Sequence, residues 1–131
     1  MSKNPVSEPV VKNSTIRAKE GETMCVLLNH VKADRRDEFE HFMRDLIMPI
    51  VARTSPAVLD QTRVLFPTQP NNDGTFTYIF LMDPLVADGE YRFRAILEQE
   101  YPPEKIDEYL PLFYDSLVVD QVEFVVTQSA W

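Results

Sequence analysis

Four polar residues lie within segments that are otherwise apolar, and they are the first candidates for chemistry. Asn29 and His30 lie in TMCVLLNHVK, Arg63 in QTRVLFP and Glu123 in QVEFVVTQ. If the strand registers bring Asn29, Arg63 and Glu123 to one sheet face, they would offer an amide, a cation and a carboxylate around a small polar-aromatic ligand. Asn29 or Arg63 could then stabilise a developing oxyanion. The structural alternative is a hydrogen bond from Asn29 to a neighbouring strand and an ion pair between Arg63 and Glu123.

Histidine is the side chain whose unperturbed pKa lies near neutrality, so the two histidines are candidate general bases. His30 directly follows Asn29, and adjacent residues of a strand point to opposite faces, so the two cannot line one cavity. His41 lies beside the apolar stripe of a predicted helix, which favours a solvent-exposed side chain. With two histidines and one cysteine, Cys25, the chain is not expected to hold a metal. We expect Cys25 to be a buried apolar residue.

Aromatic residues form a second group of candidates on the predicted strands. Tyr78 and Phe80 alternate along one strand and, with Phe66 and Phe124, would suit a planar apolar ligand if their face lines a cavity. Aromatic stripes on strands also commonly form the hydrophobic core. The run Glu90-Tyr91-Arg92-Phe93-Arg94 is predicted to be a solvated helix face rather than an anion site.

The hydrophobic pattern predicts the elements that must position these residues. Strands are predicted over residues 23–32, 61–67, 75–82 and 121–128, with Asp73-Gly74 as a hairpin turn. A helix is predicted to begin at the N-cap Asp34 and to kink or stop near Pro49. A second helical region spans residues 88–119, with interruptions at Pro102-Pro103 and distortion at Pro111. The order βαββαβ predicts an α+β, ferredoxin-like fold with an antiparallel sheet.

Both faces of the predicted sheet are too apolar to contact bulk water. We predict one face with Val26, Leu28, Val64, Phe66, Phe76, Tyr78, Phe80, Phe124 and Val126, and the other with Leu27, Asn29, Val31, Arg63, Leu65, Ile79, Leu81, Glu123 and Val125. Two helices cover one face, and each large side chain left exposed forfeits roughly 1.5–3 kcal/mol. A second subunit packed on the other face would form a homodimeric α+β barrel.

Composition limits the classes of partner. The 131 residues fit one domain, predicted over 23–131, preceded by a polar tail over 1–22 that could become ordered against a partner subunit. The net charge of -8 argues against binding to nucleic acid or to an anionic membrane surface. No apolar run approaches the ~18–20 residues of a membrane span, and no signal peptide is visible. A cytoplasmic location is therefore expected.

The segment MCVLLNHVKADRRDEFEHFM resembles the opening of the dimeric α+β barrel superfamily, in particular antibiotic-biosynthesis-monooxygenase-like domains. Val31-Lys32 and Asp37-Glu38-Phe39 occupy matching places. The resemblance implies a cofactor-independent monooxygenase that acts on an aromatic or polyketide-like substrate. Haem-degrading members use an Asn of the first strand with a Trp and a His. Here the single Trp is the terminal Trp131, so we expect no haem, no other cofactor and a colourless protein.

Two hypotheses follow. The first is an oxygenase whose substrate anion supplies the electrons, with Asn29, Arg63 or His30 as the candidate catalytic residues and Asn29, Arg63, Tyr78, Phe80 and Glu123 as the ligand-binding candidates. The alternative is a non-enzymatic ligand-binding or structural dimer whose interior is filled by its own side chains. Cavity volume separates the two: a barrel interior with no room for a ligand would contradict the enzyme, whereas a cavity of ~300 Å³ or more lined by polar groups would support it.

Overall fold

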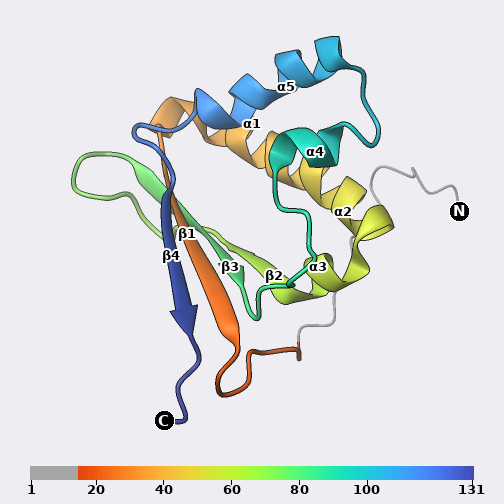
Figure 1. The fold of residues 1–131 in the computed structure, drawn as a ribbon. Coiled ribbons are helices and arrows are strands. Elements are labelled where there is room, and N and C mark those ends of the chain that lie inside the picture. The colour runs from red at the N-terminus through yellow and green to blue at the C-terminus, as the bar shows by residue number, and fades with distance from the viewer. Residues whose placement is uncertain (1–14) are drawn as a thin grey trace, which may run out of the picture.

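The computed structural model describes residues 15–131, and their element order confirms the predicted βαββαβ arrangement. The four strands form one antiparallel sheet in the order β2-β3-β1-β4. Figure 1 shows the helices gathered on one side of this sheet. The strands are β1 Thr23–Val31, β2 Thr62–Leu65, β3 Phe76–Met82 and β4 Val122–Thr127.

The first helical region is almost continuous from residue 33 to residue 61. It consists of a 3₁₀ turn Ala33–Arg35, α1 Arg36–His41, a π-helical turn Phe42–Ile47, α2 Met48–Thr54 and α3 Pro56–Gln61. The helix runs past Pro49 rather than stopping there, and the irregularity lies just before it, in the π-helical turn. A wider turn suits a position where proline removes a backbone donor and crowds the preceding turn.

Two details of this region differ from the prediction. Asp34 is not an N-cap, because it lies inside the 3₁₀ turn and the flanking Lys32 makes no side-chain cap either. The short helix α3 was not predicted, since six residues are too few to show a clear helical period. The second helical region is shorter than the predicted 88–119 and contains α4 Phe93–Leu97 and α5 Pro103–Tyr114. Helix α5 continues through Pro111.

Strand register decides which residues share a face, and it corrects the predicted grouping. Leu27 pairs with Phe80 and Asn29 with Tyr78, so these four side chains share the helix-covered face. Val26 and Leu28, which were predicted to accompany Tyr78 and Phe80, lie on the opposite face. The alternation within each strand was predicted correctly, and so were the shared faces of β1 with β4 and of β2 with β3. The predicted register between β1 and β3 was one residue out, which exchanges the faces of the two pairs.

The helix-covered face forms the hydrophobic core. Phe39 lies 4.6 Å from Tyr78 and 5.3 Å from Phe113 between ring centroids, and Phe42 lies 5.7 Å from Phe113. Tyr78 is fully buried and Phe80 is 3% exposed. Tyr78 and Phe80 of the predicted aromatic group are therefore core, whereas Phe66 is largely exposed beside the Tyr78 ring and Phe124 is exposed as well.

The opposite face carries no helix among the described residues, and we call it the open face (Figure 1). Its central residues Val26, Leu28, Ile79 and Leu81 are half-buried. Toward its margins Leu65 is 41% exposed and Phe124 is 50% exposed. Within residues 15–131, one face of the sheet thus lacks a cover, as predicted, and this face is the one that contains Leu28.

The predicted tail lies mostly outside the described residues. Where description begins, the chain already contacts the sheet: the Gly21 N–H donates to the Gln128 carbonyl at 2.9 Å, and the Gln128 N–H donates to the Glu22 carbonyl at 2.9 Å. These two hydrogen bonds extend the pairing of β1 with β4 beyond the Thr23–Thr127 pair. Within residues 15–131 no helix is long and apolar enough to cross a membrane.

Candidate functional site

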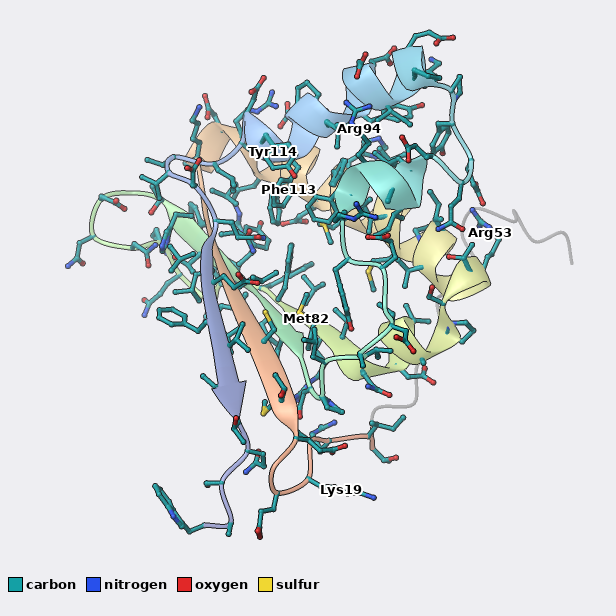
Figure 2. All side chains as sticks on the ribbon, in the orientation of Figure 1. Lys19, Arg53, Met82, Arg94, Phe113 and Tyr114 are labelled. Atoms are coloured by element: carbon teal, nitrogen blue, oxygen red, sulfur yellow. The ribbon has the colours of Figure 1, made fainter. Side chains whose placement is uncertain are left out.

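A cavity of about 260 Å³ lies between the helix-covered face of the sheet and the helices. Its floor includes Leu27, Val64 and Phe80 from three strands, all on one face because their registers align. Met82, Arg94 and Tyr114 also line it, and Figure 2 shows that these come from the sheet and from two different helices. The cavity therefore depends on packing of the whole helical layer and not on a single loop.

Apolar side chains line the interior of the cavity, including Met43, Ile47, Val51, Val58 and Ile96. This composition follows from the amphipathic first helix, whose apolar stripe must face the sheet. An apolar interior favours a ligand with a large hydrophobic surface, because burial of that surface contributes roughly 25 cal/mol per Å².

Charged groups occur at the mouth, where the segment before α4 crosses the cavity. Glu90 and Arg92 form a 2.8 Å ion pair, and the hydrogen bonds from Arg92 hold the pKa of the Glu90 carboxyl at about 2. Arg94 forms a 2.8 Å ion pair with Asp107. The predicted solvated helix face is thus only partly correct: Glu90, Tyr91 and Arg92 precede the helix, and all three line the cavity.

One polar side chain at the cavity is oriented by a buried partner. The Nε2 of Gln121 donates to Oδ1 of Asn29 at 2.8 Å, and the Nδ2 of Asn29 donates to the Tyr78 carbonyl at 3.2 Å. Asn29 is fully buried and is not among the lining residues, whereas Gln121 lines the cavity. Sequence reasoning singled out Asn29 and missed Gln121, because an isolated Gln before a strand carries no signal until the register is known.

The Tyr78 hydroxyl belongs to a separate cluster. It donates to the Glu40 carboxylate and accepts from Nε of Arg36 at 2.9 Å, while the Arg36 guanidinium lies 4.0 Å from the Phe76 ring centroid. Burial and the bond to Glu40 raise the pKa of Tyr78. Tyr78 does not line the cavity, but Phe80 does. Of these two predicted ligand-binding residues, the structure therefore places one at the cavity.

The proposed trio of Asn29, Arg63 and Glu123 is not assembled. Arg63 pairs with Leu81 in the strand register, which places it on the open face, and its ion-pair partner is Asp83 rather than Glu123. Glu123 shares the face of Leu27, but it is exposed on the edge strand and accepts a 3.7 Å hydrogen bond from the Cys25 thiol. Neither residue lines the cavity.

The histidines and the cysteine also lie away from the cavity. Nδ1 of His30 is 2.7 Å from the Thr77 hydroxyl on the open face, and His41 is exposed and 2.8 Å from Asp45. Burial, followed by the charge of Glu123, raises the pKa of Cys25, which disfavours a thiolate. Among residues 15–131, no group of three or more His, Cys, Asp or Glu side chains is arranged to hold a metal.

The chain was compared with protein families, curated proteins and solved structures. No protein-family model matches the chain, and no curated protein matches it. Its structure is similar to a solved structure from Caulobacter crescentus CB15 described as a "putative antibiotic biosynthesis monooxygenase". The two are 13% identical, the match covers 83% of this chain and 91% of that chain, and the TM-score is 0.46. It is a likeness between folds, and the α+β assignment itself rests on the element order and strand register described above.

Proposed function

We propose that this protein binds a compact, mainly apolar molecule in the cavity between the sheet and the helices. The observation that carries the proposal is a cavity of about 260 Å³ with an apolar interior and polar groups gathered at its mouth. An engineered apolar cavity of about 150 Å³ accepts benzene, so this volume admits a ligand of one or two rings. It is slightly smaller than the ~300 Å³ typical of the smallest drug-sized sites. A compact ring system is therefore favoured over an extended polyketide.

Naphthalene is a suitable probe, and calorimetric titration is a direct test. Wild-type protein is expected to bind it saturably. Val64→Phe adds volume inside the cavity and is expected to weaken binding by roughly tenfold or more, which is about 1.4 kcal/mol. Val118→Phe is the matched control, because Val118 is 48% exposed and does not line the cavity. Absence of saturable binding of both naphthalene and its hydroxylated analogue 1-naphthol, or equal weakening in both variants, would contradict the proposal.

Oxygenation is the second candidate function, favoured by N–H donors beside an apolar chamber. Gln121, Arg92 and Arg94 all line the cavity, and their side chains carry such donors. They could stabilise an oxyanion while the interior excludes water. An aromatic substrate whose C–H position becomes C=O would supply the electrons itself, and the second oxygen atom would leave as water.

This second candidate has its own test. 1-Naphthol plus O₂ would give 1,4-naphthoquinone plus water, which can be followed by absorbance. Turnover by the wild type that Val64→Phe removes and Val118→Phe retains would support an oxygenase. Naphthalene binding without any turnover of 1-naphthol would favour the non-enzymatic alternative.

We also propose that the open face packs against a second copy of the chain. The large apolar side chains exposed on that face include Leu65, Phe124 and Val126, the last at 43% exposure. Contiguous apolar surface of this kind marks protein interfaces, and an obligate homodimer buries roughly 2,000 Å² or more in total. Light scattering should give about twice the 15.2 kDa of one chain. A folded monomer at micromolar concentration would refute the dimer.

We place the protein in the cytoplasm. The thiol of Cys25 is free and buried, which suits a reducing compartment. Fractionation of cells that express the tagged chain would test this location, and recovery in a secreted fraction would contradict it.

A further inference from the structure

We propose that Gln121 reads a hydroxyl group on the ligand and that Asn29 is the positioning residue that orients the Gln121 amide. This inference rests on the proposed ligand-binding function and names the chemical class of the ligand: a compact apolar molecule with one neutral hydroxyl group, such as a phenol or a cyclic alcohol.

The directions of the hydrogen bonds that join Tyr78, Asn29 and Gln121 are set at the buried end, by the carbonyl of Tyr78. The backbone carbonyl of Tyr78 can only accept, so the side chain of Asn29 must direct Nδ2 toward it, at 3.2 Å. Oδ1 of Asn29 then faces Gln121 and accepts its N–H at 2.8 Å. Rotation of Asn29 by half a turn would oppose two oxygens in a site with no solvent exposure. The orientation of Gln121 is therefore imposed from beneath the cavity.

This arrangement leaves two groups of Gln121 for a ligand. Asn29 uses one N–H of the amide, and within residues 15–131 no protein group bonds the second N–H or the carbonyl oxygen. An acceptor and a donor on one amide match a hydroxyl, which both donates and accepts. A carboxylate only accepts, so it would face the amide oxygen without a bond. A bare hydrocarbon would desolvate the amide with no compensation.

The charged groups at the mouth serve this recognition less well. Arg92 is already paired with Glu90, and its side chain is 80% exposed. Arg94 is paired with Asp107, and their side chains are 50% and 67% exposed. Water and salt screen such pairs, so they contribute little selectivity. The hydroxyl of Tyr91 accepts from the Val86 N–H at 3.0 Å. Gln121 is thus the lining group whose orientation a fully buried side chain sets.

The test compares two probes of nearly equal shape, 1-naphthol and naphthalene. The quantity of interest is the ratio of their dissociation constants in each variant. In Gln121→Met, which keeps the length of the side chain, the preference for 1-naphthol should fall roughly tenfold relative to wild type. Gln128→Met is the matched control and should leave the ratio unchanged, because Gln128 bonds the Ser129 carbonyl outside the cavity.

Asn29→Ala tests the positioning role. It should lower the same ratio, and combination with Gln121→Met should lower it no further, since both changes remove one interaction. Gln121→Asn, which withdraws the amide by one methylene, provides a second variant should Asn29→Ala fail to fold.

The outcomes separate the two levels of the proposal. If neither probe binds wild-type protein, the proposed function itself fails. If both bind and neither Gln121→Met nor Gln121→Asn changes the ratio, only the role of Gln121 is overturned. If Gln121→Met lowers the ratio and the double variant lowers it further, Gln121 is upheld and the positioning role of Asn29 is overturned.

Discussion

The two faces of the sheet are built from alternate residues of the same strands, yet they differ in how completely the chain covers them. On the helix-covered face Val31 and Tyr78 are fully buried, and Phe80 is 3% exposed. On the open face Leu28 and Ile79 are only half-buried, and Phe124 is 50% exposed. Both faces are apolar, so composition alone does not distinguish them. Coverage by the helices does.

The comparison shows that burial and function are divided between the faces. The covered face holds both the core and the cavity, and its buried Asn29 forms hydrogen bonds through both its amide nitrogen and its amide oxygen. The open face holds Arg63 and His30, each partnered by a neighbouring polar side chain and separate from the cavity. Polar residues near the ends of strands therefore play different parts on the two faces. On the covered face Asn29 supports the cavity, whereas on the open face Arg63 and His30 lie at the border of an apolar surface.

The largest expected effect comes from truncating the core between the helices and the covered face, at Phe42 of the π-helical turn. Phe42 is fully buried between Phe93 and Phe113, with centroid distances of 5.1 Å and 5.7 Å. Phe42→Ala should lower the free energy of unfolding by about 3–5 kcal/mol, measured by urea denaturation. Phe124→Ala is the matched change on the open face and should cost under about 1 kcal/mol in the isolated chain. Similar losses in both would erase the distinction between the faces.

The next effect uses two neighbouring leucines of β1 that point to opposite faces. Leu28→Asp places a carboxylate on the open face, so it should weaken self-association by roughly a hundredfold while the monomer stays folded. Leu27→Asp places it against the cavity and Phe80, so it should mainly lower the melting temperature. Light scattering and circular dichroism on both variants distinguish the outcomes. A dimer that survives Leu28→Asp unchanged would show that the open face is not the interface.

A smaller effect is expected for the buried polar residue of the covered face. Asn29→Ala leaves the Tyr78 carbonyl without its side-chain donor and Gln121 without its acceptor. The unfolding free energy should fall by about 1–3 kcal/mol, measured by chemical denaturation. His30→Ala, which removes the bond to Thr77 on the open face, should cost less because water can replace that bond. A larger loss of unfolding free energy for His30→Ala than for Asn29→Ala would contradict the expected difference between the two faces.

The smallest expected effect on stability concerns Asp45, on the solvent-exposed side of the helices. It serves as a reference for the stability losses expected on the two faces of the sheet. Hydrogen bonds from Arg44 and then from His41 hold the pKa of Asp45 at about 2. The depressed pKa stabilises the fold above the ordinary Asp value near 3.9, and this stability is lost as pH falls through about 2. Asp45 is 41% exposed, so Asp45→Asn should cost under about 1 kcal/mol at pH 7. In thermal melts the gap between variant and wild type should shrink as pH approaches 2, and an undiminished gap would contradict the assignment.

Sequence periodicity was sufficient to predict the order of the helices and strands, but it was insufficient to predict which residues form the candidate site. Alternation showed correctly that Leu27 and Leu28 face opposite ways, because side-chain direction in a strand is a local property. Which of them faces Phe80 depends on the pairing of β1 with β3, two strands that the first helical region and β2 separate in the sequence. Strands that are apolar on both faces leave that register weakly specified by pattern. Arg63 was accordingly assigned to the wrong face, and Gln121 became visible only once Asn29 was placed.

The pairing of β4 with β1 also has a consequence for the order of folding. Thr23 pairs with Thr127, and Leu27 with Glu123, so the sheet joins segments near opposite ends of the described chain. Loop-closure entropy delays contacts of such long sequence separation. Until residues 122–127 dock, β1 is itself an edge strand with apolar side chains on both faces. During that interval β1 can pair with another molecule, and the docking of β4 ends this risk of aggregation because it covers the edge of β1.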